Sequence, residues 1–122
     1  MIGYVMVGTN DLARACAFYD ELMSALGYAR VMEEEAFVAW GESLMEPCLS
    51  VTLPFDGEPA SVGNGSMIAL RAASQDEVDS SYAKALELGA TDEGAPGLRG
   101  EGFYAAYFRD LDGNKLNLCF MG

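Results

Sequence analysis

Short apolar stretches alternate with helix-like segments along the whole chain. Residues 2–8 are apolar and rich in β-forming side chains, which predicts a buried first strand. Residues 8–11 predict a turn and a helix cap that end at Asp11. Residues 12–26 then place apolar side chains on one face at helical spacing, and Gly27 ends this helix. Three β-like stretches follow, near residues 28–33, 36–41 and 48–54. The first half therefore predicts one strand, one helix and three strands.

The same order recurs after a turn-rich segment at residues 56–64. Residues 66–71 form another short apolar strand, and Ser74 with Glu77 forms a capping box that opens a second helix. Gly89 ends that helix, and strands are expected near 91–95, 103–109 and 115–120. One helix covers only one face of a four-stranded sheet, so each unit leaves the other face in need of a partner.

This internal repeat predicts an α+β fold. We expect two tandem βαβββ modules that form a curled mixed sheet around a central cleft. The single domain, residues 1–122, would consist of module 1 (1–55), a linker (56–64) and module 2 (65–122).

Charge and composition limit the partners. With 19 acidic and 7 basic residues, the formal charge is −12, so we expect no nucleic acid and no anionic membrane as a partner. No apolar run approaches the roughly 18–20 residues of a membrane span, and the N-terminus has the pattern of a strand and not of a signal peptide. The three cysteines are far apart, which favours reduced thiols and a cytoplasmic location.

Three stretches carry a resemblance to a known superfamily. The first runs from Tyr4 to Leu12 and continues at Phe18–Tyr19; the second is Met67–Leu70. The third is the hairpin Phe108–Asn114, which has Leu111 where the superfamily usually has proline. Together with the repeat, they resemble the vicinal oxygen chelate superfamily, which includes glyoxalase I, bleomycin-resistance proteins and extradiol dioxygenases.

The resemblance implies a metal site that this chain does not reproduce. The superfamily's metalloenzymes bind their metal through histidine and glutamate, and this chain has no histidine. The corresponding positions fall on Tyr4, Met67 and Asn117, with the remaining ligand expected near Ser50 and Thr52. Transition metals prefer imidazole, carboxylate or thiolate ligands. We therefore expect no metal and no other cofactor, and we identify no catalytic residue.

The same positions would instead line a binding cleft. Pairing of the terminal hairpin predicts Tyr107 opposite Asn117 and Ala105 opposite Cys119, all on one sheet face. The glycine-rich segment 94–102 predicts a mobile loop over the cleft, and Arg99 within it is a candidate to hold a carboxylate or phosphate. The candidate cleft residues are Tyr4, Met6, Trp40, Ser50, Thr52, Met67, Arg99, Tyr107, Asn117 and Cys119.

Several of these residues have a simpler interpretation. Tyr4, Met67 and Tyr107 also fit ordinary core packing. Trp40 fits either a stacking wall or a plug in a domain interface. Cys119 has no imidazole base to activate it, which disfavours a role as nucleophile.

Two functions from different classes follow. One is a metal-free protein that binds a small, partly aromatic or hydrophobic molecule. The other is a metal-dependent lyase or isomerase resembling lactoylglutathione lyase, or a dioxygenase, and it rests on the resemblance alone. A third possibility is a cleft filled by the protein's own side chains. We expect a homodimer.

Overall fold

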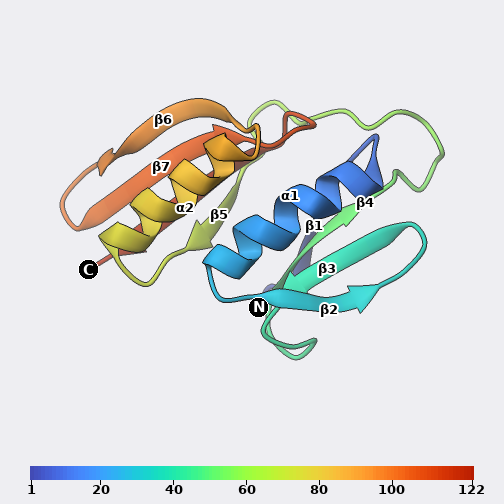
Figure 1. The fold of residues 1–122 in the computed structure, drawn as a ribbon, viewed down its shortest axis with the longest axis horizontal. Helices are drawn as coiled ribbons and strands as arrows, with labels where there is room; N and C mark the ends of the chain where they lie inside the picture. The colour runs from blue at the N-terminus through green and yellow to red at the C-terminus, as the bar shows by residue number, and fades with distance from the viewer. The chain divides into compact units, whose positions relative to one another are not determined.

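The computed structural model describes all 122 residues as two compact units, Met1–Val62 and Gly63–Gly122. Each unit has one helix against one four-stranded sheet (Figure 1). Unit 1 consists of β1 (Tyr4–Gly8), α1 (Leu12–Ala25), β2 (Ala29–Glu33), β3 (Phe37–Gly41) and β4 (Cys48–Thr52). Unit 2 consists of β5 (Ile68–Arg71), α2 (Gln75–Glu87), β6 (Thr91–Leu98), β7 (Phe103–Arg109) and β8 (Lys115–Met121).

Both sheets have the same mixed topology. The strand orders are β1-β4-β3-β2 and β5-β8-β7-β6. The pairs β1–β4 and β5–β8 are parallel, and the other pairs are antiparallel. The predicted α+β fold with two tandem βαβββ modules is therefore confirmed. The boundary between the compact units falls between Val62 and Gly63, inside the turn-rich segment.

Local sequence signals define both helices. Asp11 caps α1 by accepting a hydrogen bond from the Arg14 backbone N–H at 3.0 Å. Ser74 caps α2 by accepting one from the Glu77 N–H at 3.1 Å, and the Glu77 carboxylate accepts one from the Ala73 N–H at 3.0 Å. Both helices thus begin at the predicted capping residues, which satisfy backbone donors that the first turn leaves unpaired.

The core of unit 1 lies between α1 and the sheet. Tyr19 and Leu22 of α1 are buried, as are Trp40 of β3 and Val51 of β4. The Trp40 ring lies 5.6 Å from the Tyr19 ring, and its indole N–H donates to Asp20 Oδ1 at 2.9 Å. Trp40 therefore packs against the helix, which corrects our expectation that it lines a cleft. Burial of side chains of this size stabilises the fold by about 1.5–3 kcal/mol each.

The core of unit 2 is built in the same way. Val78 and Ala85 of α2 are buried, as are Phe108, Leu116 and Leu118 of the sheet. Because side chains alternate along a strand, the residues between these three point to the opposite face.

Two further segments differ from or refine the sequence expectations. Strand β6 extends to Leu98 and pairs with β7 through two irregularities, so much of the predicted 94–102 loop is strand. The segment after β4 is held against the start of α1, because Asn10 Oδ1 accepts a hydrogen bond from the Ala60 N–H at 2.7 Å.

No helix in the structure combines the length and apolar character needed to cross a membrane.

Candidate functional site

A pocket of about 350 Å³ lies on the face of the unit 1 sheet opposite α1. We call it the sheet pocket. Its lining comes from β1, β2, β3, β4 and the β3–β4 loop, and consists of Gly3, Tyr4, Met6, Met32, Phe37, Ala39, Leu44, Cys48 and Ser50. Apart from the Ser50 and Tyr4 hydroxyls and the Cys48 thiol, these side chains are apolar. Such a lining is typical of small-molecule sites.

Strand register explains how this pocket forms. Met6 of β1 pairs with Ser50 of β4, and Ser50 pairs with Ala39 of β3. Ser50 and Ala39 are small and buried, whereas Tyr4 and Met6 are 66% and 42% exposed. Short side chains across the centre of the sheet, next to long side chains in β1, leave a hollow with a small floor and apolar walls.

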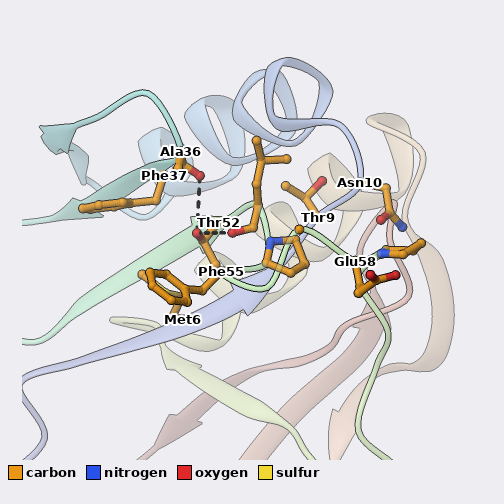
Figure 2. Close-up of a pocket in the computed structure, with 12 residues that line it drawn as sticks. Met6, Thr9, Asn10, Ala36, Phe37, Thr52, Phe55 and Glu58 are labelled. Carbon is orange, nitrogen blue, oxygen red and sulfur yellow. Dashed lines mark hydrogen bonds between the residues drawn. The ribbon is translucent and has the colours of Figure 1, made fainter.

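A second hollow, the linker pocket, adjoins the same side chains. Its volume is about 950 Å³, and Figure 2 shows its lining. Met6 and Phe37 line both pockets. Thr52 of β4 and all of the segment Leu53–Pro59 except Asp56 line the linker pocket alone. The Thr52 hydroxyl donates to the Leu53 carbonyl at 2.7 Å, so that hydroxyl is already bonded within the chain.

The close fit of the linker depends on Gly8 and Ala60. A Cβ atom at Gly8 would lie 3.1 Å from the Ala60 Cβ atom, which is tighter than ordinary contact. The Asn10 side chain bonds the Ala60 backbone at both its N–H and its carbonyl. Together these contacts fix the segment that forms one wall of the linker pocket.

In unit 2, the remaining candidate residues share the sheet face opposite α2. Tyr107 pairs with Asn117, and Ala105 pairs with Cys119, as the hairpin register predicts. Asn117 is buried; its amide N–H donates to the Ala106 carbonyl at 3.2 Å, and its Oδ1 has no hydrogen-bond partner. An unpartnered buried acceptor costs about 1–3 kcal/mol.

Cys119 is not suited to nucleophilic chemistry. The thiol is buried, and this desolvation raises its pKa, although the positive charge of Arg71 acts in the opposite direction. Since the thiolate is the reactive form, a raised pKa lowers reactivity at neutral pH.

Two cations lie beside the Tyr107 ring. The Arg99 guanidinium carbon and the Lys115 Nζ are each 5.6 Å from the ring centroid, within cation–π range. Met67, just before β5, is 45% exposed. These side chains give the open face of the unit 2 sheet an aromatic and cationic character.

The predicted site residues therefore fall into two sets. Tyr4, Met6 and Ser50 line the sheet pocket, and Thr52 lines the linker pocket. The unit 2 set is Met67, Arg99, Tyr107, Asn117 and Cys119. Sequence reasoning missed the other pocket residues, notably Met32, Phe37 and Leu44. Alternation along residues 37–41 places Phe37 and Ala39 on one face and Trp40 on the other. This pattern could have indicated from the sequence that Phe37 shares a face with Ala39 and not with Trp40.

The residues at the superfamily's ligand positions do not fit a divalent transition metal. No group of three or more His, Cys, Asp or Glu side chains in the structure is arranged to hold a metal ion. Tyr4, Ser50, Met67 and Asn117 supply a phenol, an alcohol, a thioether and an amide. None of these carries the negative charge or imidazole nitrogen that such metals prefer. We therefore derive no chemical step through a metal.

Comparison with known proteins agrees with this layout. The family model of the Glyoxalase/Bleomycin resistance protein/Dioxygenase superfamily matches residues 1–118. The chain belongs to this superfamily. A glyoxalase/bleomycin resistance protein from Albidiferax ferrireducens has a similar crystal structure, with 35% identity and a TM-score of 0.90, covering 98% of this chain and 97% of that one.

Two solved structures of lower identity show a similar fold. A glyoxalase/bleomycin resistance protein/dioxygenase family enzyme from Burkholderia phytofirmans is 19% identical, with a TM-score of 0.74 and coverage of 96% of this chain and 95% of that one. Lactoylglutathione lyase from Agrobacterium tumefaciens is 22% identical, with a TM-score of 0.71 and coverage of 98% and 92%. No curated protein matches the chain significantly.

Proposed function

We propose that this member of the superfamily binds a small, partly aromatic or hydrophobic molecule in the sheet pocket, without a catalytic metal. The observation that carries the proposal is the pocket itself, an apolar hollow of about 350 Å³ on an open sheet face. That volume lies in the range of small-molecule sites, which begins at roughly 300 Å³.

The exposed walls give a physical reason for binding. Tyr4, Met6 and Leu44 all expose a large part of their apolar surface to water. Covering such surface is favourable by about 25 cal/mol per Å². Methionine side chains adapt their shape and make favourable sulfur–aromatic contacts, so Met6 and Met32 suit a flat aromatic ligand.

A few polar groups would orient the ligand. The buried Ser50 lies at the floor of the pocket, and the Tyr4 hydroxyl belongs to its exposed wall. In apolar surroundings a hydrogen bond to such a group favours one ligand orientation over others, because an unpaired polar atom is costly there.

Membership of a superfamily whose name includes bleomycin resistance proteins supports a binding role. The metal-dependent lyase, isomerase or dioxygenase alternative finds less support, because the side chains at the ligand positions are poor metal donors. We propose in addition that the protein is a homodimer. We also propose that it works in the cytoplasm, where its three free cysteines would stay reduced.

A neutral fluorescent dye tests the proposal. Nile red is aromatic and uncharged, so charged groups elsewhere contribute little to its binding. We expect saturable binding at one site, weakened about tenfold or more, roughly 1.4 kcal/mol, by the double variant Tyr4→Ala/Met6→Ala. Tyr28→Ala removes an equally large exposed side chain that lines neither pocket, and it should change the affinity less than about twofold.

Circular dichroism and thermal unfolding should show that both variants remain folded, since the mutated side chains are exposed. Absence of saturable binding, or equal weakening by Tyr28→Ala, would overturn the proposal for this pocket.

A further inference from the structure

Basic residues are few in this chain and unevenly distributed. Five of the seven Lys and Arg residues belong to unit 2. Three of them occupy strand positions on the open face of its sheet: Arg71 pairs with Cys119, and Arg109 pairs with Lys115. Arg99 lies over Tyr107 on the same face. A chain with formal charge −12 thus gathers four cations on one surface.

Two arginines of the protein form close ion pairs with carboxylates, and one of them, Arg109, belongs to this face. Arg30 binds Asp20 and Glu33 at 2.8 Å, and Arg109 binds Glu93 at 2.7 Å. Arg71, Arg99 and Lys115 have no carboxylate within ion-pair distance, although the chain holds 19 acidic residues. Their charges are therefore available to an external anion.

The Arg99 guanidinium packs closely against two glycines, Gly94 and Gly97. A Cβ atom at Gly97 would lie 2.9 Å from Arg99 Nη1, and one at Gly94 would lie 3.3 Å from Nη2. Nη2 donates to the Ala95 carbonyl, and the guanidinium lies over the Tyr107 ring. A larger residue at either glycine would displace the cation. The group is thus held in one place, with most of its N–H donors unused.

Glu93 of β6 binds Arg109, but β7 and β8 place no acidic side chain on this face. On this face β8 presents Lys115, Asn117, Cys119 and Met121, and β7 presents Phe103, Ala105, Tyr107 and Arg109. Arg71 also acts on this surface, since its charge influences the Cys119 thiol. The cations on this face outnumber the Glu93 carboxylate, so the local charge is positive on a protein whose overall charge repels anions.

We propose that the open face of the unit 2 sheet binds the oxyanion of a small molecule, a carboxylate or phosphate, through Arg99 and Lys115 beside the Tyr107 ring. Charge-assisted hydrogen bonds from a guanidinium or ammonium to an oxyanion are about twice as strong as neutral ones. A guanidinium held in place loses little further freedom when the anion binds.

Titrations with benzoate and with inorganic phosphate test this site. Backbone amide NMR shifts of Gly94, Gly97 and Tyr107, and the Asn117 side-chain amide shifts, report on binding. We expect saturable shifts with benzoate, and none with benzamide, which has the same ring and no charge. If phosphate displaces benzoate, the site binds either type of oxyanion. If phosphate does not displace benzoate, the site requires a carboxylate.

Two variants distinguish the effect of the position of the Arg99 guanidinium from the effect of the positive charges. Arg99→Gln/Lys115→Gln should weaken benzoate binding about tenfold or more. Gly97→Ala retains every charge but places a methyl group where the Arg99 guanidinium lies, so we expect about three- to tenfold weakening. The clash is with the far end of the Arg99 side chain and not with backbone, so the fold should persist. Arg14→Gln is the control, because it removes one positive charge from α1 in unit 1.

Equal shifts from benzoate and benzamide would overturn the proposal, as would the same weakening in Arg14→Gln. Unchanged affinity in both Gly97→Ala and Arg99→Gln/Lys115→Gln would do so too. All the test variants lie in unit 2 and the Nile red variants lie in unit 1, so this site and the sheet pocket can fail independently.

Discussion

Trp40 donates its indole N–H to the Asp20 carboxylate at 2.9 Å, and the same carboxylate receives two hydrogen bonds from the Arg30 guanidinium at 2.8 Å. These three residues come from β3, α1 and β2. One carboxylate thus joins the helix to two strands. Because Trp40 is the only tryptophan, its fluorescence reports on this junction.

The Asp20 junction predicts sensitivity to acid. Hydrogen bonds from Arg30, with a further one from Trp40, hold the Asp20 pKa below its usual value and outweigh desolvation. A carboxyl with a lowered folded pKa stabilises the fold above its unfolded pKa, about 4, and this contribution disappears as the pH falls through the folded value. We expect Asp20→Asn to lower the free energy of unfolding near neutral pH by about 1 kcal/mol.

Urea unfolding followed by Trp40 fluorescence at neutral pH and near pH 3 checks this prediction. The difference between variant and parent should shrink at the lower pH, because the carboxyl of the parent is then becoming protonated. Glu42→Gln removes an exposed carboxylate and serves as the control. A difference that does not change with pH would contradict the assignment.

The α2 cap predicts a measurable stability effect. Ser74→Ala removes the acceptor for the Glu77 N–H and should cost about 1 kcal/mol, within the 0.5–2 kcal/mol typical of such caps. Ser74→Asp retains an acceptor and should recover most of the loss. Thermal unfolding of the parent and the two variants tests this prediction. No loss in Ser74→Ala would mean that the cap contributes nothing, and equal loss in the Ala and Asp variants would mean that the hydrogen-bond acceptor is not the source of the stability.

The turn between β7 and β8 depends on Asp110. This buried carboxylate accepts hydrogen bonds from the backbone N–H groups of Asp112 and Asn114, both at 2.9 Å. We expect Asp110→Ala to destabilise the protein by about 2 kcal/mol, because it leaves two partly buried backbone donors unpaired. Asp112→Ala retains both acceptor bonds to Asp110 and should cost less. Chemical denaturation of both variants tests this order.

All three cysteines should react slowly in the native protein. Cys16, Cys48 and Cys119 are buried, and desolvation raises the pKa of Cys16 and Cys119. We expect Ellman's reagent to label them completely in urea and only slowly without it. Rapid labelling of one cysteine in the folded protein would reveal an accessible, activated thiol and reopen a catalytic role for it.

The side chains at the superfamily's metal-ligand positions predict weak binding of transition metals. Untagged protein dialysed against manganese, iron, nickel and zinc should retain less than about a tenth of an equivalent by elemental mass spectrometry. A polyhistidine tag must be removed first, because it would supply the missing ligands. One tightly bound equivalent would mean that other side chains form the metal site, and a metal-dependent enzyme would become the better proposal.

Local residue patterns were enough to predict the elements, their order and part of their pairing. Both helices begin at residues recognised as caps, Asp11 and Ser74, because capping is a local interaction over three or four residues. Tyr107 faces Asn117 as expected, because the tight turn after Asp110 fixes the register of the hairpin.

The sheet face that each strand presents to the helix, and the positions of the pockets, depend on packing between distant parts of the chain. Alternation along β3 separates Trp40 from Ala39, but packing against Tyr19 of α1 determines that Trp40 is the one in the core. The linker pocket depends on contact between Asn10 and Ala60, fifty residues apart in the chain. Periodicity and turn chemistry act over a few residues, whereas a pocket forms from side chains that only folding brings together.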